Sequence, residues 1–289
     1  MAFLYFCKVN VNDEIYSVYK KDKNVSDIID NLIVNINSNV FIEDEDQKSR
    51  IKFVTLVPDI DRRYVCGRLI KIFTDDIQVY NEKLDDIEDI PSDRLTRSCT
   101  FYFDAKTEIV AFTVGKYFGY KKFCQYFEIL INKCTEEGAF NVTLLQDSEL
   151  FKSKLKRLSK AEKIEINLVA KNPCEEELNE WYANPKAMEE IEANKLRLIY
   201  ESQGKKSNGL KIDSGYFAKL LDSLETGYVK FIKVIGKNLS GLKDDITSDL
   251  TAPKRFSIPD KDKLSIPAVH EHGATFIPRL MSFTSGKDK

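Results

Sequence analysis

Residues 98–133 read SCTFYFDAKTEIVAFTVGKYFGYKKFCQYFEILINK, and this stretch decides the fold class. Two β-rich runs, Cys99–Phe103 and Glu108–Val114, flank a short polar turn at 104–107, which predicts a β-hairpin. A helical pattern follows, and its apolar positions share one face: Phe123, Phe127, Leu130, Ile131 and Cys134. The segment therefore predicts a protein in which a helix packs on a sheet.

Similar patterns extend in both directions along the chain. Alternating runs at 2–9 and 14–20 predict a hairpin, and Ser26 is a candidate N-cap for an Ile-rich helix. Further expected elements are strands at 50–57, 64–73 and 77–80, a loop that ends near Pro91, a strand at 140–145, a helix at 148–160 and a strand at 163–170. Because hairpins and helices alternate irregularly, we expect an α+β fold with mixed, mostly antiparallel sheets and helices packed on one side.

The polar stretch QGKKSN at 203–208 is the best candidate for a linker. We therefore expect an N-terminal α+β domain at 1–202 and a C-terminal α/β subdomain at 209–289. The end of the chain, from Ala252, is expected to be an irregular tail because it is rich in proline, with Pro253, Pro259, Pro267 and Pro278.

The bulk composition restricts the class of protein only weakly. Lys and Arg number 44 and Asp and Glu 46, so the formal net charge of −2 neither demands nor forbids a polyanionic partner. The first eleven residues contain Lys8 and Asn10 and lack the long apolar core of a signal peptide. Six scattered cysteines without a C-x-x-C pair suggest reduced thiols, and together these features predict a cytoplasmic protein.

A first candidate site resembles that of a metal-dependent nuclease. Pro58-Asp59 followed by Asp104-Ala105-Lys106 matches a P-D…D-x-K pattern, in which two acids hold a divalent metal and the lysine stabilises charge at the attacked phosphate. Chance matches to so short a pattern occur, and Asp46-Gln47-Lys48 is one. Mg²⁺ is the cofactor of this alternative; otherwise we expect no cofactor, no metal site and no catalytic residue.

A second candidate is His270-Glu271-His272, which contains both histidines of the chain. On a strand they would face the same side and could share a metal, but no third ligand is suitably spaced, so an exposed turn in the tail is the simpler interpretation. The chain also has no nucleophile elbow and no phosphate-binding glycine loop. These absences favour a protein without conventional small-molecule catalysis.

The third candidate is a basic surface. The expected helix at 148–160 places basic side chains opposite its apolar stripe, where a phosphate backbone would relieve their mutual repulsion and release counterions. A solvated helix face is the alternative. Other basic pairs flank expected turns, so the complete candidate nucleic-acid-binding set is Lys152, Lys154, Lys156, Arg157, Lys160, Lys121, Lys122, Arg62 and Arg63.

The order of parts resembles a known family, the RexA/KwaB-like phage-exclusion and antiphage-defence proteins of phages and bacteria. The similarity rests on the N-terminal β-hairpin and Ile/Leu-rich helix, the strand–turn–strand TFYFDAKTEIVAFTVG, the helix KKFCQYFEIL, the basic helix and the strand KIEINLVAKNP, and it covers about residues 1–180. The resemblance implies a cytoplasmic homodimer that binds double-stranded DNA without strong sequence preference. It also implies a partner protein from the same defence system, often one embedded in the membrane.

Three functions therefore stand as hypotheses. The favoured one is a DNA-binding sensor or effector of antiphage defence, which acts with little or no catalysis. The second is a nuclease of the same setting, which would depend on Asp59, Asp104 and Lys106. The third is a non-catalytic interaction module that recognises a phage protein.

Overall fold

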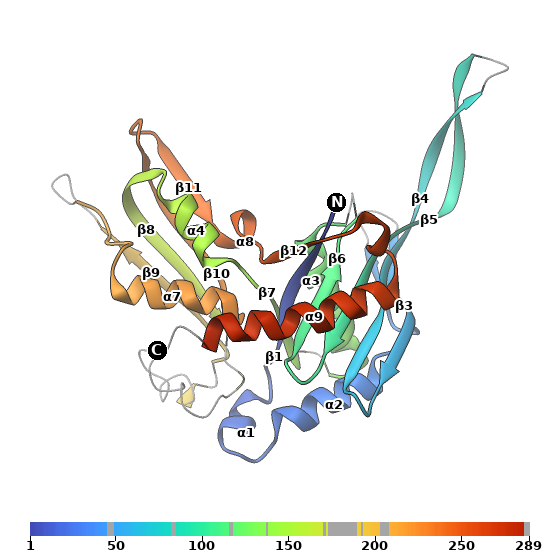
Figure 1. Ribbon diagram of the computed structural model, residues 1–289, viewed down its shortest axis with the longest axis horizontal. Coiled ribbons are helices and arrows are strands. Elements are labelled where there is room, and N and C mark those ends of the chain that lie inside the picture. The colour runs from blue at the N-terminus through green and yellow to red at the C-terminus, as the bar shows by residue number, and fades with distance from the viewer. Residues whose placement is uncertain are drawn as a thin grey trace.

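The computed structural model describes residues 1–44, 49–81, 85–115, 118–136, 138–169, 172, 190–191, 193–202 and 208–285. Within these ranges the chain forms two antiparallel sheets with helices, so the predicted α+β class is confirmed (Figure 1). Of the expected linker at 203–208, residues 203–207 lie outside the described residues. No helix among the described residues is long and apolar enough to cross a membrane.

Sheet 1 has eight strands, in the order β12-β1-β6-β5-β4-β3-β2, with β7 also paired to β1. The strands are β1 (Ala2–Val11), β2 (Phe41–Asp44), β3 (Ser49–Asp59), β4 (Tyr64–Asn81), β5 (Asp86–Asp104), β6 (Ile109–Thr113), β7 (Phe140–Leu144) and β12 (Arg255–Ile258). The predicted hairpin around residues 104–107 is β5–β6, in which Phe101 pairs with Phe112 and Asp104 with Ile109.

Helices cover both faces of sheet 1, whereas the sequence predicted helices on one side. These helices are α1 (Ile15–Tyr19), α2 (Val25–Asn35), α3 (Tyr120–Cys134) and α9 (Ile266–Ser285). Alternate β1 residues divide between two cores: Cys7 packs with α2 and α3, whereas Phe6 packs with α9. This alternation follows from the two-residue period of a strand. The helix predicted from the opening stretch is therefore α3, and its Phe123 stacks on Phe112 with ring centroids 3.8 Å apart.

Sheet 2 has four strands in the order β11-β10-β8-β9. Its elements are α4 (Ser148–Leu155), β8 (Leu158–Val169), β9 (Lys195–Glu201), α7 (Gly215–Thr226), β10 (Val229–Asn238), β11 (Lys243–Thr247) and α8 (Ser248–Thr251), and a 3-10 turn at Asp260–Asp262 precedes α9. One face of the sheet packs against α4 and α7, with Phe151, Phe217 and Ile166 fully or almost fully buried. The other face is rich in charged side chains.

Buried amides join the two sheets. Asn10 of β1 donates its side-chain amide to the carbonyl of Gly227 at 3.2 Å, and Gln146, which follows β7, donates to the carbonyl of Lys230 at 2.9 Å. Both side chains are fully buried. Because a buried amide must find partners, these bonds fix how sheet 2 is attached to sheet 1. The expected domain division at 202/209 runs through sheet 2, since β8 and β9 precede it and β10 and β11 follow it.

Four local predictions were wrong. The N-cap of α2 is Asn24, not Ser26. Within the stretch 14–20, Ile15–Tyr19 forms the helix α1 instead of a second strand. The stretch after Phe73 continues in β4 and pairs with β5 as far as Asn81↔Asp86, so it forms a long two-stranded arm instead of a short strand and loop (Figure 1). The tail from Ala252 contains β12 and α9, because its apolar side chains complete the second core of sheet 1. Pro278 is accommodated inside α9.

The stacked ring of Phe123 gives a direct test of this core. Phe123→Ala should lower the free energy of unfolding by about 3–5 kcal/mol, because it removes a fully buried aromatic ring and leaves a cavity. Urea unfolding followed by circular dichroism measures the change. Val34→Ala, at a residue 64% exposed on α2, is the control and should change stability by less than about 0.5 kcal/mol. Equal effects of the two substitutions would contradict the described packing of α3.

Candidate polyanion-binding site

Three lysines form a row across one end of sheet 2, and we call Lys160, Lys237 and Lys243 the lysine row. Lys237 of β10 is the direct cross-strand partner of Lys243 on β11 and of Lys160 on β8. Directly opposed residues of antiparallel strands point to the same face, so the three ammonium groups share one side of the sheet. Like charges placed opposite each other are destabilising.

One carboxylate is shared by two members of the row. Glu162 lies 4.0 Å from the ammonium group of Lys160 and 3.9 Å from that of Lys237. These distances are at the long limit of an ion pair, and both lysines keep substantial exposure, 25% and 52% of their side chains. The ammonium groups of Lys160 and Lys237 therefore share one carboxylate. Such an arrangement favours a further anion from outside.

The rest of the same face is electrostatically balanced. Lys163 lies 3.0 Å from Glu165 and 3.1 Å from Glu201, Arg197 lies 2.9 Å from Glu165, and Lys233 of β10 lies 2.8 Å from Asp245. The hydrogen bond to Glu165 raises the pKa of Lys163, and the bond from Lys163 holds the pKa of Glu165 below its usual value. The excess of positive charge is therefore local to the lysine row.

The predicted basic helix at 148–160 was wrong in its second half. Helix α4 ends at Leu155, and β8 begins at Leu158. The spacing of Phe151, Leu155 and Leu158 fits a helix, but pairing of β8 with β10 from Leu158 onward satisfies far more backbone groups. Lys160 therefore projects from a strand, on the face opposite α4, instead of continuing a helical stripe.

Several residues of the predicted set nevertheless gather at this end of sheet 2. Lys154 and Lys156 are exposed at the end of α4, while Lys152 pairs with Glu149 at 2.7 Å. Arg157 pairs with Asp244 of β11 at 3.1 Å and so ties the α4–β8 connection to β11, across the intervening β10. Lys156 and Arg157 therefore lie in the short connection between α4 and β8, just before the strand end that bears Lys160.

The other predicted basic residues lie elsewhere and hold elements together. Lys121, at the start of α3, pairs with Asp249 of α8 at 2.6 Å, and the neighbouring Lys122 lies 3.4 Å from the hydroxyl of Tyr126. Arg62 is 3.8 Å from Asp59, and Arg63 is 2.8 Å from Asp30 of α2. The turn with these two arginines joins β3 to β4 beside α2, far from α4 (Figure 1). The predicted set does not converge into one surface.

In the sheet, Tyr64 lies between the two acids of the predicted nuclease pattern. Asp59 and Asp104 both pair with Tyr64, from opposite sides of β4. Each carboxylate is engaged in its own turn: Asp59 accepts from the backbone N–H of Arg62 at 2.9 Å, and Asp104 accepts from the hydroxyl of Thr107 at 2.8 Å. No group of three or more His, Cys, Asp or Glu side chains in the described ranges is arranged to hold a metal. The local geometry supports a structural role for both acids.

The two histidines are on α9, so the expected exposed turn was wrong. His270 stacks on Tyr64 with ring centroids 4.7 Å apart, while a ring nitrogen of His272 lies 2.9 Å from Asp262. Two positions apart on a helix, the side chains point in different directions. Both therefore help to attach α9 and its preceding turn to the fold.

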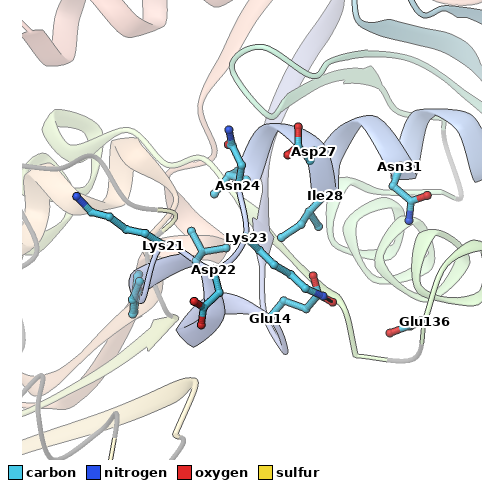
Figure 2. Close-up of a pocket in the computed structure, with 12 residues that line it drawn as sticks. Glu14, Lys21, Asp22, Lys23, Asn24, Asp27, Ile28, Asn31 and Glu136 are labelled. Atoms are coloured by element: carbon cyan, nitrogen blue, oxygen red, sulfur yellow. Dashed lines mark hydrogen bonds and ion pairs between the residues drawn. The ribbon is translucent and has the colours of Figure 1, made fainter.

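The charged side chains that line a large cleft among the described residues are mostly carboxylates, which would repel a polyanion. Its volume is about 1180 Å³, and it lies between α1, the start of α2 and Glu136 (Figure 2). The lining includes the carboxylates of Glu14, Asp22, Asp27 and Glu136 and the two lysines Lys21 and Lys23. Lys23 is paired with Glu14. Phosphate binding is therefore better supported at the lysine row than in this cleft.

Sequence reasoning missed Lys243 and did not connect Lys237 with Lys160. The available signal was the stretch KNLSGLK at 237–243, in which Asn238 and Gly241 are typical of a tight turn between two lysines. Recognising this hairpin would have paired Lys237 with Lys243. Their alignment with Lys160 depends on a long-range strand pairing, which one sequence does not reveal.

Residues 31–271 match a protein family described as "Domain of unknown function (DUF4747)". No curated protein matches the chain. The matched range contains every described strand of sheet 2 and the lysine row, together with most of sheet 1.

The pH dependence of protein stability tests the ion pairs that Glu165 forms with Lys163 and Arg197. Because the folded-state pKa of Glu165 is lowered, its ion pairs stabilise the fold above the unfolded pKa, and this contribution is lost as the pH falls through the folded pKa. Glu165→Gln should therefore destabilise the protein at neutral pH and have less effect under acidic conditions. Urea unfolding midpoints of the original protein and of Glu165→Gln, measured across this pH range, test this expectation. A difference between the two midpoints that did not change with pH would contradict the assigned ion pairs of Glu165. Glu149→Gln, at an exposed pair on α4, is the control.

Proposed function

Because this chain belongs to the DUF4747 family of domains of unknown function, we propose its function from its own charged surface: it binds double-stranded DNA through the lysine row. The observation that supports this proposal is the cross-strand alignment of Lys160, Lys237 and Lys243, in which Lys160 and Lys237 share the carboxylate of Glu162. A phosphate backbone would replace like-charge repulsion by attraction. Release of its condensed counterions would add to the binding free energy.

The dimensions of the row suit a nucleic-acid backbone. Neighbouring strands are about 4.8 Å apart, so the outer lysines are separated by about 10 Å, and one DNA strand advances about 3.4 Å along the helix axis per charge. The row is therefore long enough to reach more than one phosphate of a strand. Lysines that contact phosphates position a protein on DNA without reading its bases, which fits binding without strong sequence preference.

The resemblance to RexA/KwaB-like proteins supplies the biological setting of the proposal. We propose a cytoplasmic antiphage-defence protein of bacterial origin that acts as a homo-oligomer with a partner protein. DNA binding is its sensing or effector step, and no residue of the chain is assigned to catalysis. Experiment must distinguish this proposal from two alternatives. One is a nuclease that uses Asp59, Asp104 and Lys106, and the other is a module that recognises a phage protein.

The direct test replaces the three lysines of the row with neutral glutamines, which removes their positive charge without reversing it. A variant with Lys160→Gln, Lys237→Gln and Lys243→Gln should bind labelled duplex DNA at least tenfold more weakly, measured by fluorescence anisotropy from 50 to 200 mM salt. If all three lysines contact phosphates, the slope of log affinity against log salt should fall by about 2.7. Reading the same samples on a gel, with Mg²⁺ present, shows whether the DNA is cleaved.

A matched control removes three lysines from other parts of the surface. Lys20→Gln, Lys52→Gln and Lys261→Gln change the net charge equally and should leave both affinity and salt slope close to those of the original protein. Equal losses in the two triple variants would reject the lysine row as the site. Absence of salt-sensitive DNA binding in the original protein would reject the proposed function, and shortened DNA would favour the nuclease.

A further inference from the structure

We propose that the turn between β10 and β11 docks on anionic lipid bilayers, with Leu239 and Leu242 inserted among the lipids. This goes beyond DNA binding, because it assigns a second ligand and a different pair of contacting side chains. The turn lies at the end of sheet 2, beside the α4–β8 connection, and projects from the sheet (Figure 1).

The turn is held in one conformation by its polar residues. The side-chain oxygen of Asn238 accepts from the backbone N–H groups of Ser240 at 2.9 Å and Leu242 at 3.1 Å. The backbone N–H of Asn238 donates to the carbonyl of Leu242 at 2.9 Å, and Gly241 has a φ of +77°, which favours glycine. The two leucines are therefore displayed on a preformed turn, with little ordering required on binding.

Both leucines are turned out into solvent. Leu239 is 82% exposed and Leu242 is 67% exposed, although leucine is among the residues most often buried. Single exposed apolar residues are ordinary on protein surfaces, but these two share one turn of the chain. Because both side chains are largely exposed, they are free to insert into a lipid interface, which needs no preformed pocket.

The charges next to the turn identify the kind of lipid. Lys237 and Lys243 flank it directly in the sequence, and Lys160 lies beside Lys237. A basic residue close to a membrane surface is attracted to anionic headgroups, and exposed apolar side chains add binding through the area they bury. The combination fits a bilayer with acidic lipids and does not fit a neutral one.

Vesicle sedimentation at 100 mM salt tests the proposal with the full chain. The protein should sediment with vesicles of phosphatidylcholine and 30% phosphatidylserine and at least tenfold less with phosphatidylcholine alone. The double variant Leu239→Ser and Leu242→Ser should weaken partition into the anionic vesicles by about tenfold per leucine. Both positions are exposed, so the variant is expected to fold normally.

A second leucine pair provides the matched control. Leu250→Ser and Leu264→Ser, at residues 58% and 49% exposed away from the turn, should leave vesicle binding unchanged. Loss of vesicle binding in only the Leu239/Leu242 variant supports the proposal. Failure of the original protein to bind anionic vesicles would overturn it, and so would undiminished binding by the Leu239/Leu242 variant.

Duplex-DNA affinity separates this inference from the proposed function. The Leu239/Leu242 variant should bind DNA as the original protein does, because the leucines contact no phosphate, whereas the Lys160/Lys237/Lys243 variant should lose affinity for both ligands. A leucine variant that loses DNA and vesicles together would indicate a damaged sheet end and overturn the assignment of the turn. DNA binding without vesicle binding would reject the lipid proposal alone.

Discussion

Strand β1 is the element on which the remaining structure depends, because both of its edges are paired along most of its length. β6 occupies one edge, while β12 and then β7 share the other. Its side chains alternate between two cores that are built from different helices. A strand in this position cannot shift its register by one residue without exchanging both cores. The pairing with β12 also anchors the distant C-terminal region to the start of the chain.

The same strand fixes the attachment of sheet 2. Asn10 near the end of β1 reaches Gly227, and Gln146 follows the strand that pairs with β1. The lysine row is at the end of β10 opposite this attachment, since Lys230 is the second residue of the strand and Lys237 the last but one. Repulsion among the row's lysines is thus confined to a strand end, where it costs the fold least. The matched pairs, such as Lys163 with Glu165, are placed further along the sheet.

Local pattern was sufficient where one segment supplies both partners of a contact. The hairpin around residues 104–107 and the helix with Phe123 fall in this class, and both are present. Prediction failed where a distant partner decided the conformation. Residues 158–160 fit the end of a helix by spacing, but pairing with β10 makes them a strand. Proline in the last part of the chain suggested an irregular tail, yet burial of Val269 and Leu280 against sheet 1 outweighs the local cost of Pro278 in α9.

The candidate site could not be found from total charge, because charge of opposite sign is segregated on the surface. The cleft beside α1 and α2 gathers four carboxylates, whereas the lysine row aligns three ammonium groups, two of which share the carboxylate of Glu162. These regions nearly cancel in the sum, which is why a net charge of −2 is compatible with a local anion-binding surface. Strand pairing converts lysines that are about eighty residues apart in the sequence, Lys160 and Lys243, into one surface. The informative quantity is therefore the charge of each cross-strand row, and only the fold defines those rows.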